Sequence, residues 1–330
     1  MPPPTAPAAP VLPPILGLHH VSAIAGDPQR VLDFYTEVLG LRLVKRTVNF
    51  DDPGTYHLYF GDEQGRPGSL LTFFPWPRAR RGRAGVGQAS AVAFAVPAAA
   101  LGWWEKRLQA AAVPVERLAP RFGAPVLRAA DPDGLRLEMV GDAELADTPH
   151  QPWHAASVPP AQAIRGFDSV TLCQQGFEST AALLRLMGFR PAGEEANRYR
   201  FVLGAGGAAT RCDLQCSAEA PYGTSGAGTV HHVAWRVDDD PAQRDWRAHL
   251  AALRLNVTPV IDREYFRSIY FREPGGVLFE IATDPPGFTV DEPLAELGGT
   301  LRLPPWLEPE RQRIEAVLPP LHAHPPVSAT

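Results

Sequence analysis

The chain has 330 residues, 45% of them hydrophobic and 20% charged, and its formal net charge is −5. A chain of this length is expected to form two domains or a set of packed repeats rather than one small core. The negative charge gives no basic surface for nucleic acid or anionic lipid, and no apolar run is long enough to cross a membrane.

The ends of the chain and its cysteines predict a cytoplasmic protein. The N-terminus has no basic region followed by an apolar core, so no secretory signal is expected. Three cysteines cannot form an even set of disulfides, which fits a reducing compartment. Residues 1–14 are rich in proline and alanine and are expected to be disordered.

The first of four related units opens with an apolar strand that holds His19 and His20. Asp27 is then placed as a helix N-cap with Pro28 at the first helical position, and the helix is expected to end at Gly40. Three strand-like runs follow, at residues 41–49, 56–60 and 69–74. The unit therefore reads strand, helix, strand, strand, strand.

The other three units repeat this order. The second has an opening strand at 90–94, a helix at 101–111 and a closing strand at 134–139. The third has an opening strand at 167–171, a helix at 179–186 and a closing strand near 212–216. The fourth has its histidine strand at 230–234, a helix that starts at Asp240-Pro241, and strands at 257–261, 268–271 and 277–282.

The repeats predict an α+β fold of four βαβββ modules that form two half-barrel domains. Each module alone has too few strands for an independent core, so pairs of modules are expected to bury their sheet faces together. In sequence order, residues 15–146 hold the first two modules, 147–163 form a linker, and 164–303 hold the last two. Residues 304–330 are expected to form a C-terminal helix and a proline-rich tail.

Superposing the modules singles out positions for one metal. The opening strands align at His20, Ala91, Ser169 and His232. The closing strands, aligned on their leading glycines, place Thr72, Glu138 and Glu280 at one position. Only the first and fourth modules offer histidines, so these two must face each other if His20 and His232 share a metal.

Two neutral imidazoles and one carboxylate are the ligands of a non-haem Fe(II) centre with open coordination positions, and Mn(II) accepts the same set. We therefore predict that His20, His232 and Glu280 bind a metal. Thr72 stands where a fourth ligand would be, so room remains for a substrate oxygen and O2. Glu138 has no histidine partner in its module and is expected to be hydrogen-bonded structure.

Neighbouring residues of a strand point to opposite faces, so only one histidine of each pair, His20 or His232, is expected to face the metal. Two further histidines, His57 and His249, are expected to be surface or packing residues. A terminal helix over residues 304–318, carrying Trp306, is expected to pack on the barrel or on a second copy of the chain, so a homo-oligomer is compatible with the sequence.

These motifs resemble the vicinal-oxygen-chelate superfamily, whose glyoxalase-like domains are built from βαβββ modules around a metal. Within it the chain is similar to the hydroquinone ring-cleaving dioxygenases, of the 2,6-dichlorohydroquinone 1,2-dioxygenase and methylhydroquinone-associated type. The resemblance extends from about residue 16 to 318. It is carried by 17–22, 35–43, 230–234 and the stretch from Arg263 to Glu280.

The resemblance implies Fe(II) held by His20, His232 and Glu280. It further implies that the residues around the metal take part in catalysis: His19, Ser22, His231, Arg263 and Tyr270. Ser22 departs from the threonine expected at its position. The implied reaction is extradiol-type opening of a hydroquinone or related aromatic diol by O2, in which His19 or His231 would carry a proton with a pKa near the working pH.

Two other functions remain open on the same fold. The first is a metal-dependent glyoxalase-like isomerase or thiol transferase; such sites usually have four protein ligands, and Thr72 argues against it. The second is a non-catalytic protein that binds an aromatic compound or drug, which the complete ligand set disfavours.

Overall fold

The computed structural model describes residues 12–143, 145 and 148–322. Residues 1–11 of the segment predicted to be disordered, and residues 323–330 of the proline-rich tail, lie outside the described residues. Residues 12–14 differ from the predicted disorder, because the Pro13 carbonyl accepts a hydrogen bond of 2.9 Å from Trp246 Nε1. Within the described part, no helix is long and apolar enough to span a membrane.

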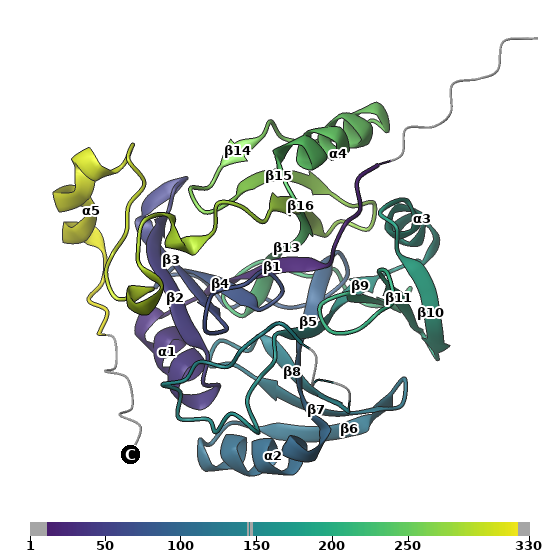
Figure 1. Cartoon of the computed structure of the whole chain (residues 1–330). Helices are drawn as coiled ribbons and strands as arrows, with labels where there is room; N and C mark the ends of the chain where they lie inside the picture. Colours follow the sequence, from purple (N-terminus) through teal and green to yellow (C-terminus); the bar gives the residue numbers. More distant parts are fainter. Residues whose placement is uncertain (1–11, 144, 146–147, 323–330) are drawn as a thin grey trace, which may run out of the picture.

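The first of two eight-stranded sheets combines the first and fourth modules (Figure 1). Its strand order is β14, β15, β16, β13, β1, β4, β3, β2. The strands are β1 (Leu18–Ala25), β2 (Arg42–Asn49), β3 (Asp52–Gly61), β4 (Leu70–Pro75), β13 (Thr229–Val237), β14 (Ile261–Asp262), β15 (Arg267–Arg272) and β16 (Leu278–Thr283).

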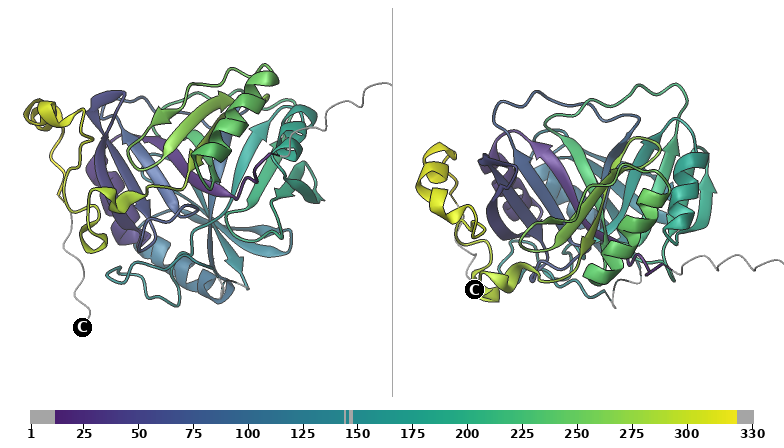
Figure 2. Two further views of the ribbon diagram at one scale, coloured as in Figure 1. Left: turned by 45° about the horizontal axis from the view of Figure 1, so that its top comes forward. Right: turned by 90° about the horizontal axis from the view of Figure 1, so that it is seen from above.

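The second sheet combines the second and third modules in the order β10, β11, β12, β9, β5, β8, β7, β6. Its strands are β5 (Gln88–Pro97), β6 (Val115–Arg121), β7 (Ala124–Ala130), β8 (Arg136–Asp142), β9 (Phe167–Gln174), β10 (Arg190–Glu195), β11 (Arg198–Val202) and β12 (Arg211–Cys216). Both sheets curl into half-barrels, which confirms the predicted α+β fold of four modules (Figure 2).

Helices lie on the outside of the sheets (Figure 1). They are α1 (Pro28–Asp33), which continues as a π-helical turn over Phe34–Val38, α2 (Leu101–Ala110), α3 (Glu178–Leu186), α4 (Asp240–Ala252) and α5 (Arg311–Val317). Short 3-10 turns occupy Ala98–Ala100, Phe288–Val290, Leu294–Glu296 and Glu308–Glu310.

The modules join through their opening strands. Strand β1 pairs antiparallel with β13, and β5 pairs antiparallel with β9. This is the pairing of the first and fourth modules that a metal shared by His20 and His232 requires. Each sheet thus takes strands from both segments, 15–146 and 164–303. The two domains predicted along the sequence stay a proposal.

Local signals in the sequence place most element boundaries. Asp27 caps α1 by accepting a hydrogen bond from the Arg30 backbone N–H, as expected. Asp239, one residue before the predicted Asp240, caps α4. The predicted strand at 257–261 is wrong except for its last residue, because Pro259 cannot donate to a sheet.

The C-terminal helix is shorter than the predicted 304–318. Its regular turns, α5, begin at Arg311 after a 3-10 turn. Prolines at 304, 305 and 309 remove backbone donors and delay the helix. Trp306 lies before the helix, is 49% exposed and packs edge-to-face against Phe50.

A buried carboxylate links the first module to the second. Tyr35, in the π-helical turn, donates a hydrogen bond of 3.1 Å to Asp131 Oδ2, and the Leu135 backbone N–H donates to Oδ1 at 2.8 Å. Burial raises the pKa of Asp131 to about 6, against an ordinary value of 3.8. The folded protein therefore holds a proton on this group more tightly than the unfolded chain does.

This raised pKa predicts a stability change between about pH 4 and pH 6. The contribution of Asp131 to folding is most favourable below the unfolded pKa and is lost as pH rises to the folded value of about 6. A shift of about two pKa units corresponds to roughly 3 kcal/mol. We expect Asp131→Asn to remove this part of the pH dependence of the free energy of unfolding, measured by urea denaturation. The exposed Asp245→Asn should behave like the wild type, and an Asp131→Asn curve parallel to wild type would contradict the raised pKa.

Candidate metal centre

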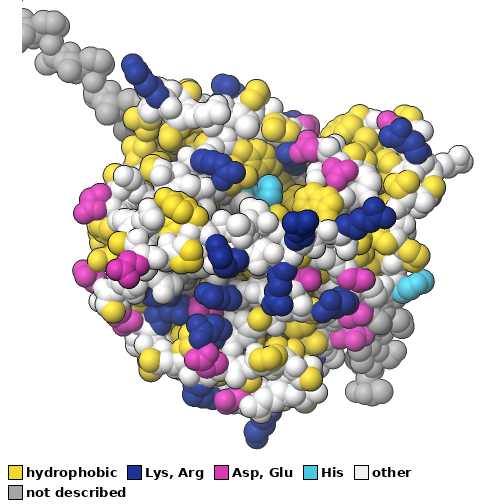
Figure 3. Space-filling view, turned by 180° about the vertical axis from the view of Figure 1, so that it is seen from behind, with side chains coloured by type: hydrophobic (Ala, Val, Ile, Leu, Met, Phe, Trp, Pro, Cys, Tyr) yellow, Lys and Arg dark blue, Asp and Glu magenta, His cyan; other side chains and the backbone are white. Residues whose placement is uncertain are grey.

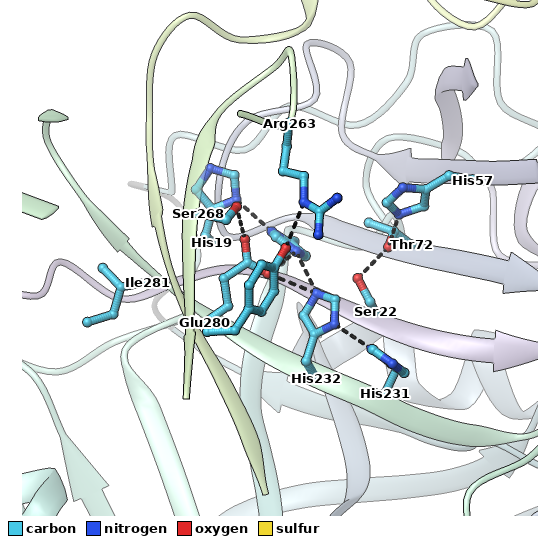
Figure 4. A network of polar contacts seen from close by, with 12 residues as sticks. His19, Ser22, His57, Thr72, His231, His232, Arg263, Ser268, Glu280 and Ile281 are labelled. Carbon is cyan, nitrogen blue, oxygen red and sulfur yellow. Dashed lines mark hydrogen bonds and ion pairs between the residues drawn. The ribbon is translucent and has the colours of Figure 1, made fainter. Parts of the chain in front are cut away.

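Three adjacent strands in the middle of the first sheet carry the predicted ligands. His20 lies on β1, His232 on β13 and Glu280 on β16, and the sheet order places β13 between the other two. His20 Nε2 and His232 Nε2 lie 3.1 Å apart. Glu280 Oε2 lies 3.2 Å from His20 Nε2 and 2.9 Å from His232 Nε2 (Figure 4). The structure thus brings together the three residues that the sequence singled out.

The donor set fits a metal cation. His20 Nδ1 lies 2.9 Å from His19 Nδ1, and His232 Nδ1 lies 2.8 Å from His231 Nδ1. When each metal-facing histidine donates its Nδ1 proton to its neighbour, both Nε2 lone pairs point at the Glu280 carboxylate. Glu280 Oε2 is buried and has no hydrogen-bond partner among the described residues. Three converging lone-pair donors are satisfied by a cation.

Two β-bulges explain how both members of each histidine pair turn toward the site. In the pairing of β1 with β13, His19 is the extra residue beside Leu18 and His20, and His231 is the extra residue on the other strand. A bulge re-aims a side chain. The expectation that the two histidines of a pair point to opposite faces is therefore corrected: each outer histidine contacts the ring of its metal-facing neighbour.

The two outer histidines differ in exposure: His19 is buried, whereas the side chain of His231 is exposed at the cavity. Burial lowers the pKa of His19 well below its ordinary value. For the buried His19, this direction is opposite to the expected pKa near the working pH. For His231, whose side chain is exposed, the role of proton carrier stays a prediction. Through their Nδ1 atoms, His19 and His231 orient His20 and His232.

Glu280 is ionised at the centre of this cluster. Burial favours its neutral form, but when the Nε2 atoms of His20 and His232 carry protons, their charge and hydrogen bonds outweigh burial and hold the pKa of Glu280 well below its usual range. A metal cation at the same point would act in the same direction. Ser268 on β15 donates a hydrogen bond of 2.5 Å to Glu280 Oε1. The other oxygen, Oε2, is the one that faces the two histidines.

Strand register shows that Thr72 stands in the first module where Glu280 stands in the fourth. In every module the residue two positions after the opening site is paired with the closing site: Ser22 with Thr72, Ala93 with Glu138, Thr171 with Asp213, and Ala234 with Glu280. Thr72 is fully buried and its hydroxyl lies 2.6 Å from Ser22 Oγ. The register also places Asp213, which the sequence alignment did not.

The equivalent positions of the second sheet hold ion pairs. Arg121 donates two hydrogen bonds to Glu138, at 2.5 and 2.8 Å, and Arg200 donates two to Asp213, at 2.8 and 3.0 Å. Guanidinium groups here occupy the place of a cation, so Glu138 is structural, as expected. In the part of the chain that the structure describes, only His20, His232 and Glu280 group as metal ligands.

A cavity of about 320 Å³ opens beside the three ligands. Figure 3 shows a histidine at the bottom of a hollow surrounded mainly by apolar side chains. The wall contains aromatic rings and a few polar groups, and its lining comprises His20, Asn49, Phe50, Asp51, His57, Tyr59, Phe74, Trp76, His231, His232, Arg263, Phe266, Tyr270 and Leu278. The cavity suits a flat aromatic compound that has a small number of polar substituents.

Arg263 and Tyr270 meet at the edge of this cavity. Arg263 follows β14 directly; its Nε donates to the Tyr270 hydroxyl at 3.2 Å, and its Nη1 pairs with Asp51 at 2.9 Å. Tyr270 lies opposite Glu280 in the pairing of β15 with β16. Burial and the charge of Glu280 raise the pKa of Tyr270, which keeps its phenol protonated and able to donate.

His57 is a cavity residue that the sequence reasoning missed. It was expected to be a surface or packing residue, but on β3 it lines the cavity, with Nε2 2.9 Å from the Thr72 hydroxyl and Nδ1 2.9 Å from the Tyr59 hydroxyl. Burial lowers its pKa well below the ordinary value. The sequence did carry a signal for His57: side chains alternate between the two faces of a strand, so His57 and Tyr59 of β3 lie on one face.

The sequence matches the family described as "Glyoxalase/Bleomycin resistance protein/Dioxygenase superfamily" over residues 17–139 and 168–281. It is 48% identical over 308 residues to "Putative ring-cleaving dioxygenase MhqO" of Bacillus subtilis, covering 92% of this chain and 96% of that protein. It is 39% identical over 306 residues to the "Chlorohydroquinone/hydroquinone 1,2-dioxygenase" of Sphingobium indicum, covering 88% and 92%.

Solved structures show the same fold. The crystal structure of a "putative dioxygenase" from Bacillus subtilis has a TM-score of 0.89 and 47% identity, covering 94% of this chain and 99% of that one. Glyoxalase I from Zea mays has a TM-score of 0.58 at 16% identity, covering 81% and 92%, a likeness of fold alone.

Proposed function

Because the chain belongs to the glyoxalase, bleomycin-resistance and dioxygenase superfamily, we propose that it is a non-haem Fe(II) dioxygenase that opens the ring of a hydroquinone or related aromatic diol with O2. One observation carries the proposal: three lone-pair donors converge beside an aromatic-lined cavity, while the fourth ligand position holds a hydroxyl. The printed names of relatives that match over most of the chain support ring cleavage as the reaction class.

We propose His20, His232 and Glu280 as the residues that hold the metal. Bound Fe(II) would supply open positions for a substrate oxygen and for O2, and it would allow electrons to pass between them. The low-pKa carboxylate of Glu280 keeps the ligand set negatively charged at neutral pH. His19 and His231 hold the two ligand rings in the orientation that points Nε2 at the metal.

The polar groups of the cavity wall suit a phenolic substrate. Tyr270 accepts from Arg263, so its own O–H is free to donate to a substrate oxygen. The guanidinium of Arg263 favours negative charge on an oxygen in the cavity and so favours a deprotonated diol. Phe50, Phe74 and Phe266 provide apolar surface against which an aromatic ring packs.

We further propose extradiol-type cleavage, in which the bond broken lies beside one hydroxyl-bearing carbon. The Arg263–Tyr270 pair lies at one edge of the cavity, where it can hold one ionised oxygen. Attack beside that oxygen requires no second hydroxyl on the adjacent carbon, so a hydroquinone is a suitable substrate.

The direct experiment is anaerobic loading with Fe(II), followed by O2 uptake with a panel of hydroquinones and catechols. We expect O2 consumption and a ring-opened product with hydroquinones, and a parallel series with Mn(II) would identify the active metal. Uptake with catechols alone would contradict the substrate assignment. Glyoxalase activity with Ni(II) or Zn(II), in the absence of any O2 uptake, would indicate the rival isomerase.

A further inference from the structure

We propose that Tyr59 and His57 are positioning residues that fix the direction of a hydrogen-bond chain running from Tyr59 through His57 and Thr72 to Ser22. The chain makes the Ser22 hydroxyl a hydrogen-bond donor for an oxygen atom bound at the proposed metal centre of His20, His232 and Glu280. This inference rests on the proposed function, because that oxygen would belong to the diol or to O2.

The four residues form one continuous chain of short contacts. Tyr59 Oη lies 2.9 Å from His57 Nδ1, His57 Nε2 lies 2.9 Å from Thr72 Oγ1, and Thr72 Oγ1 lies 2.6 Å from Ser22 Oγ. Tyr59, Thr72 and Ser22 are at most 1% exposed. Three neighbouring strands, β3, β4 and β1, supply the residues, so the sheet itself sets the spacing.

The ring of His57 cannot easily turn away from this chain. Tyr59 lies against it with ring centroids 4.0 Å apart, and Phe74 lies against it at 4.2 Å. Both neighbouring rings are tilted by only about 35° or less from the imidazole plane. His57 is neutral because burial lowers its pKa, so one ring nitrogen donates and the other accepts.

Tyr59 decides which nitrogen of His57 donates. Its buried phenol proton needs an acceptor, and His57 Nδ1 is the one hydrogen-bond partner of the Tyr59 hydroxyl among the described residues. Tyr59 therefore donates to Nδ1, which leaves the imidazole proton on Nε2. His57 Nε2–H then donates to Thr72 Oγ1.

The same direction continues to Ser22. Having accepted from His57, Thr72 donates its proton to Ser22 Oγ. Ser22 has no other hydrogen-bond partner among the described side chains, so its own proton remains available. Ser22 lies two residues after His20 on β1, and Figure 4 shows Ser22 and Thr72 beside His232, away from Ser268. A donor at this place would stabilise negative charge on an oxygen bound at the fourth position.

The chain also engages the Thr72 hydroxyl before any metal binds. The hydroxyl accepts from His57 and donates to Ser22, which leaves one lone pair on a neutral oxygen, a weaker ligand than the carboxylate at the equivalent position of the fourth module. His57 is not one of the three residues whose ligand atoms converge. It therefore acts on the centre through Thr72 and Ser22.

A first experiment measures the tautomer without any substrate. Full-length protein labelled with ¹⁵N-histidine and loaded with diamagnetic Zn(II) gives imidazole tautomers by long-range ¹H–¹⁵N correlation, and His57→Gln identifies the His57 signals. We expect the His57 proton on Nε2 in the wild type and a mixture of tautomers in Tyr59→Phe. The matched control is Tyr56→Phe on the same strand, whose hydroxyl instead donates to Pro319 O. A wild-type proton on Nδ1 would overturn the proposal.

A second experiment measures turnover of the Fe(II)-loaded protein. Tyr59→Phe and Thr72→Val should each lower kcat about tenfold with KM changed less than about twofold, because a developing charge loses a donor. The double variant should lose no more than either single variant, since both interrupt one chain. Thr72→Ser should recover most of the activity lost in Thr72→Val. Losses that multiply in the double variant would overturn the proposal.

The two experiments separate this inference from the proposed function. A wild-type protein that binds metal but consumes no O2 with any diol refutes the dioxygenase. In that case the tautomer measurement still reports whether Tyr59 fixes the direction of the chain. Active protein in which His57 carries its proton on Nδ1, or in which Tyr59→Phe turns over at the wild-type rate, refutes the chain alone.

Discussion

Replacing His232 with alanine is expected to abolish tight metal binding and O2 uptake together. The change removes one of three donors from a centre in which Glu280 Oε2 has no hydrogen-bond partner among the described residues. Loss of residues that only orient a ligand typically weakens metal affinity by about 10–100-fold, so loss of a ligand should weaken it by more than about 100-fold. Anaerobic Fe(II) titration and metal analysis after desalting measure the first effect directly.

Thermal stability gives a second readout for the same variant. A metal that binds only the folded protein raises the melting temperature, and this increase should be present in the wild type and nearly absent in His232→Ala. The matched control is His154→Ala. The His154 side chain is 79% exposed and contacts Glu63, which lies on none of the three strands that carry the proposed ligands. Stoichiometric metal retained by His232→Ala would contradict the assignment of the centre.

The sequence predicted the cluster of His20, His232 and Glu280 because the repeats carried redundant information. His20 and His232 occur in equivalent strands of two modules, and Glu280 was found by aligning closing strands on their glycines. Strand pairing then placed Ser22 beside Thr72 and Ala234 beside Glu280, which is the same alignment expressed as contacts. The glycine that precedes a closing strand can be recognised in the sequence without three-dimensional information.

What the sequence did not predict depends on contacts between strands. The bulges at His19 and His231 follow from the register of β1 against β13, which no local pattern specifies. The lowered pKa of His19 follows from burial, and the place of His57 depends on Thr72 of the neighbouring strand. In each case the deciding neighbour is distant along the chain or on the next strand.

The arginine pairs of the second sheet show the same limit. Glu138 and Asp213 occupy ligand positions, but Arg121 and Arg200 reach them from β6 and β11. Two sheets of one topology thus surround their buried carboxylates differently, one with guanidinium groups and one with the two histidines of the proposed metal centre. The difference lies in the opening positions, where histidine is present in one sheet and alanine or serine in the other.

Replacing Thr72 with glutamate tests why the open fourth position matters. The register places residue 72 where Glu280 stands in the fourth module, so a carboxylate there is aimed at the same centre. We expect Thr72→Glu to bind the metal more tightly than wild type, because a charged fourth ligand is added, and to lower O2 uptake more than about 100-fold, because a position needed for substrate or O2 is filled.

The control for this change must separate size from charge. Thr72→Gln has nearly the same volume as Thr72→Glu in a position that is fully buried, but its amide is a weaker ligand. Both variants should be destabilised without metal, since each crowds His57 and Ser22. Only Thr72→Glu should regain stability when Zn(II) is added, beyond the increase seen in wild type. If Thr72→Glu consumed O2 at the wild-type rate while holding the metal more tightly, the fourth position would not be the one that substrate and O2 require.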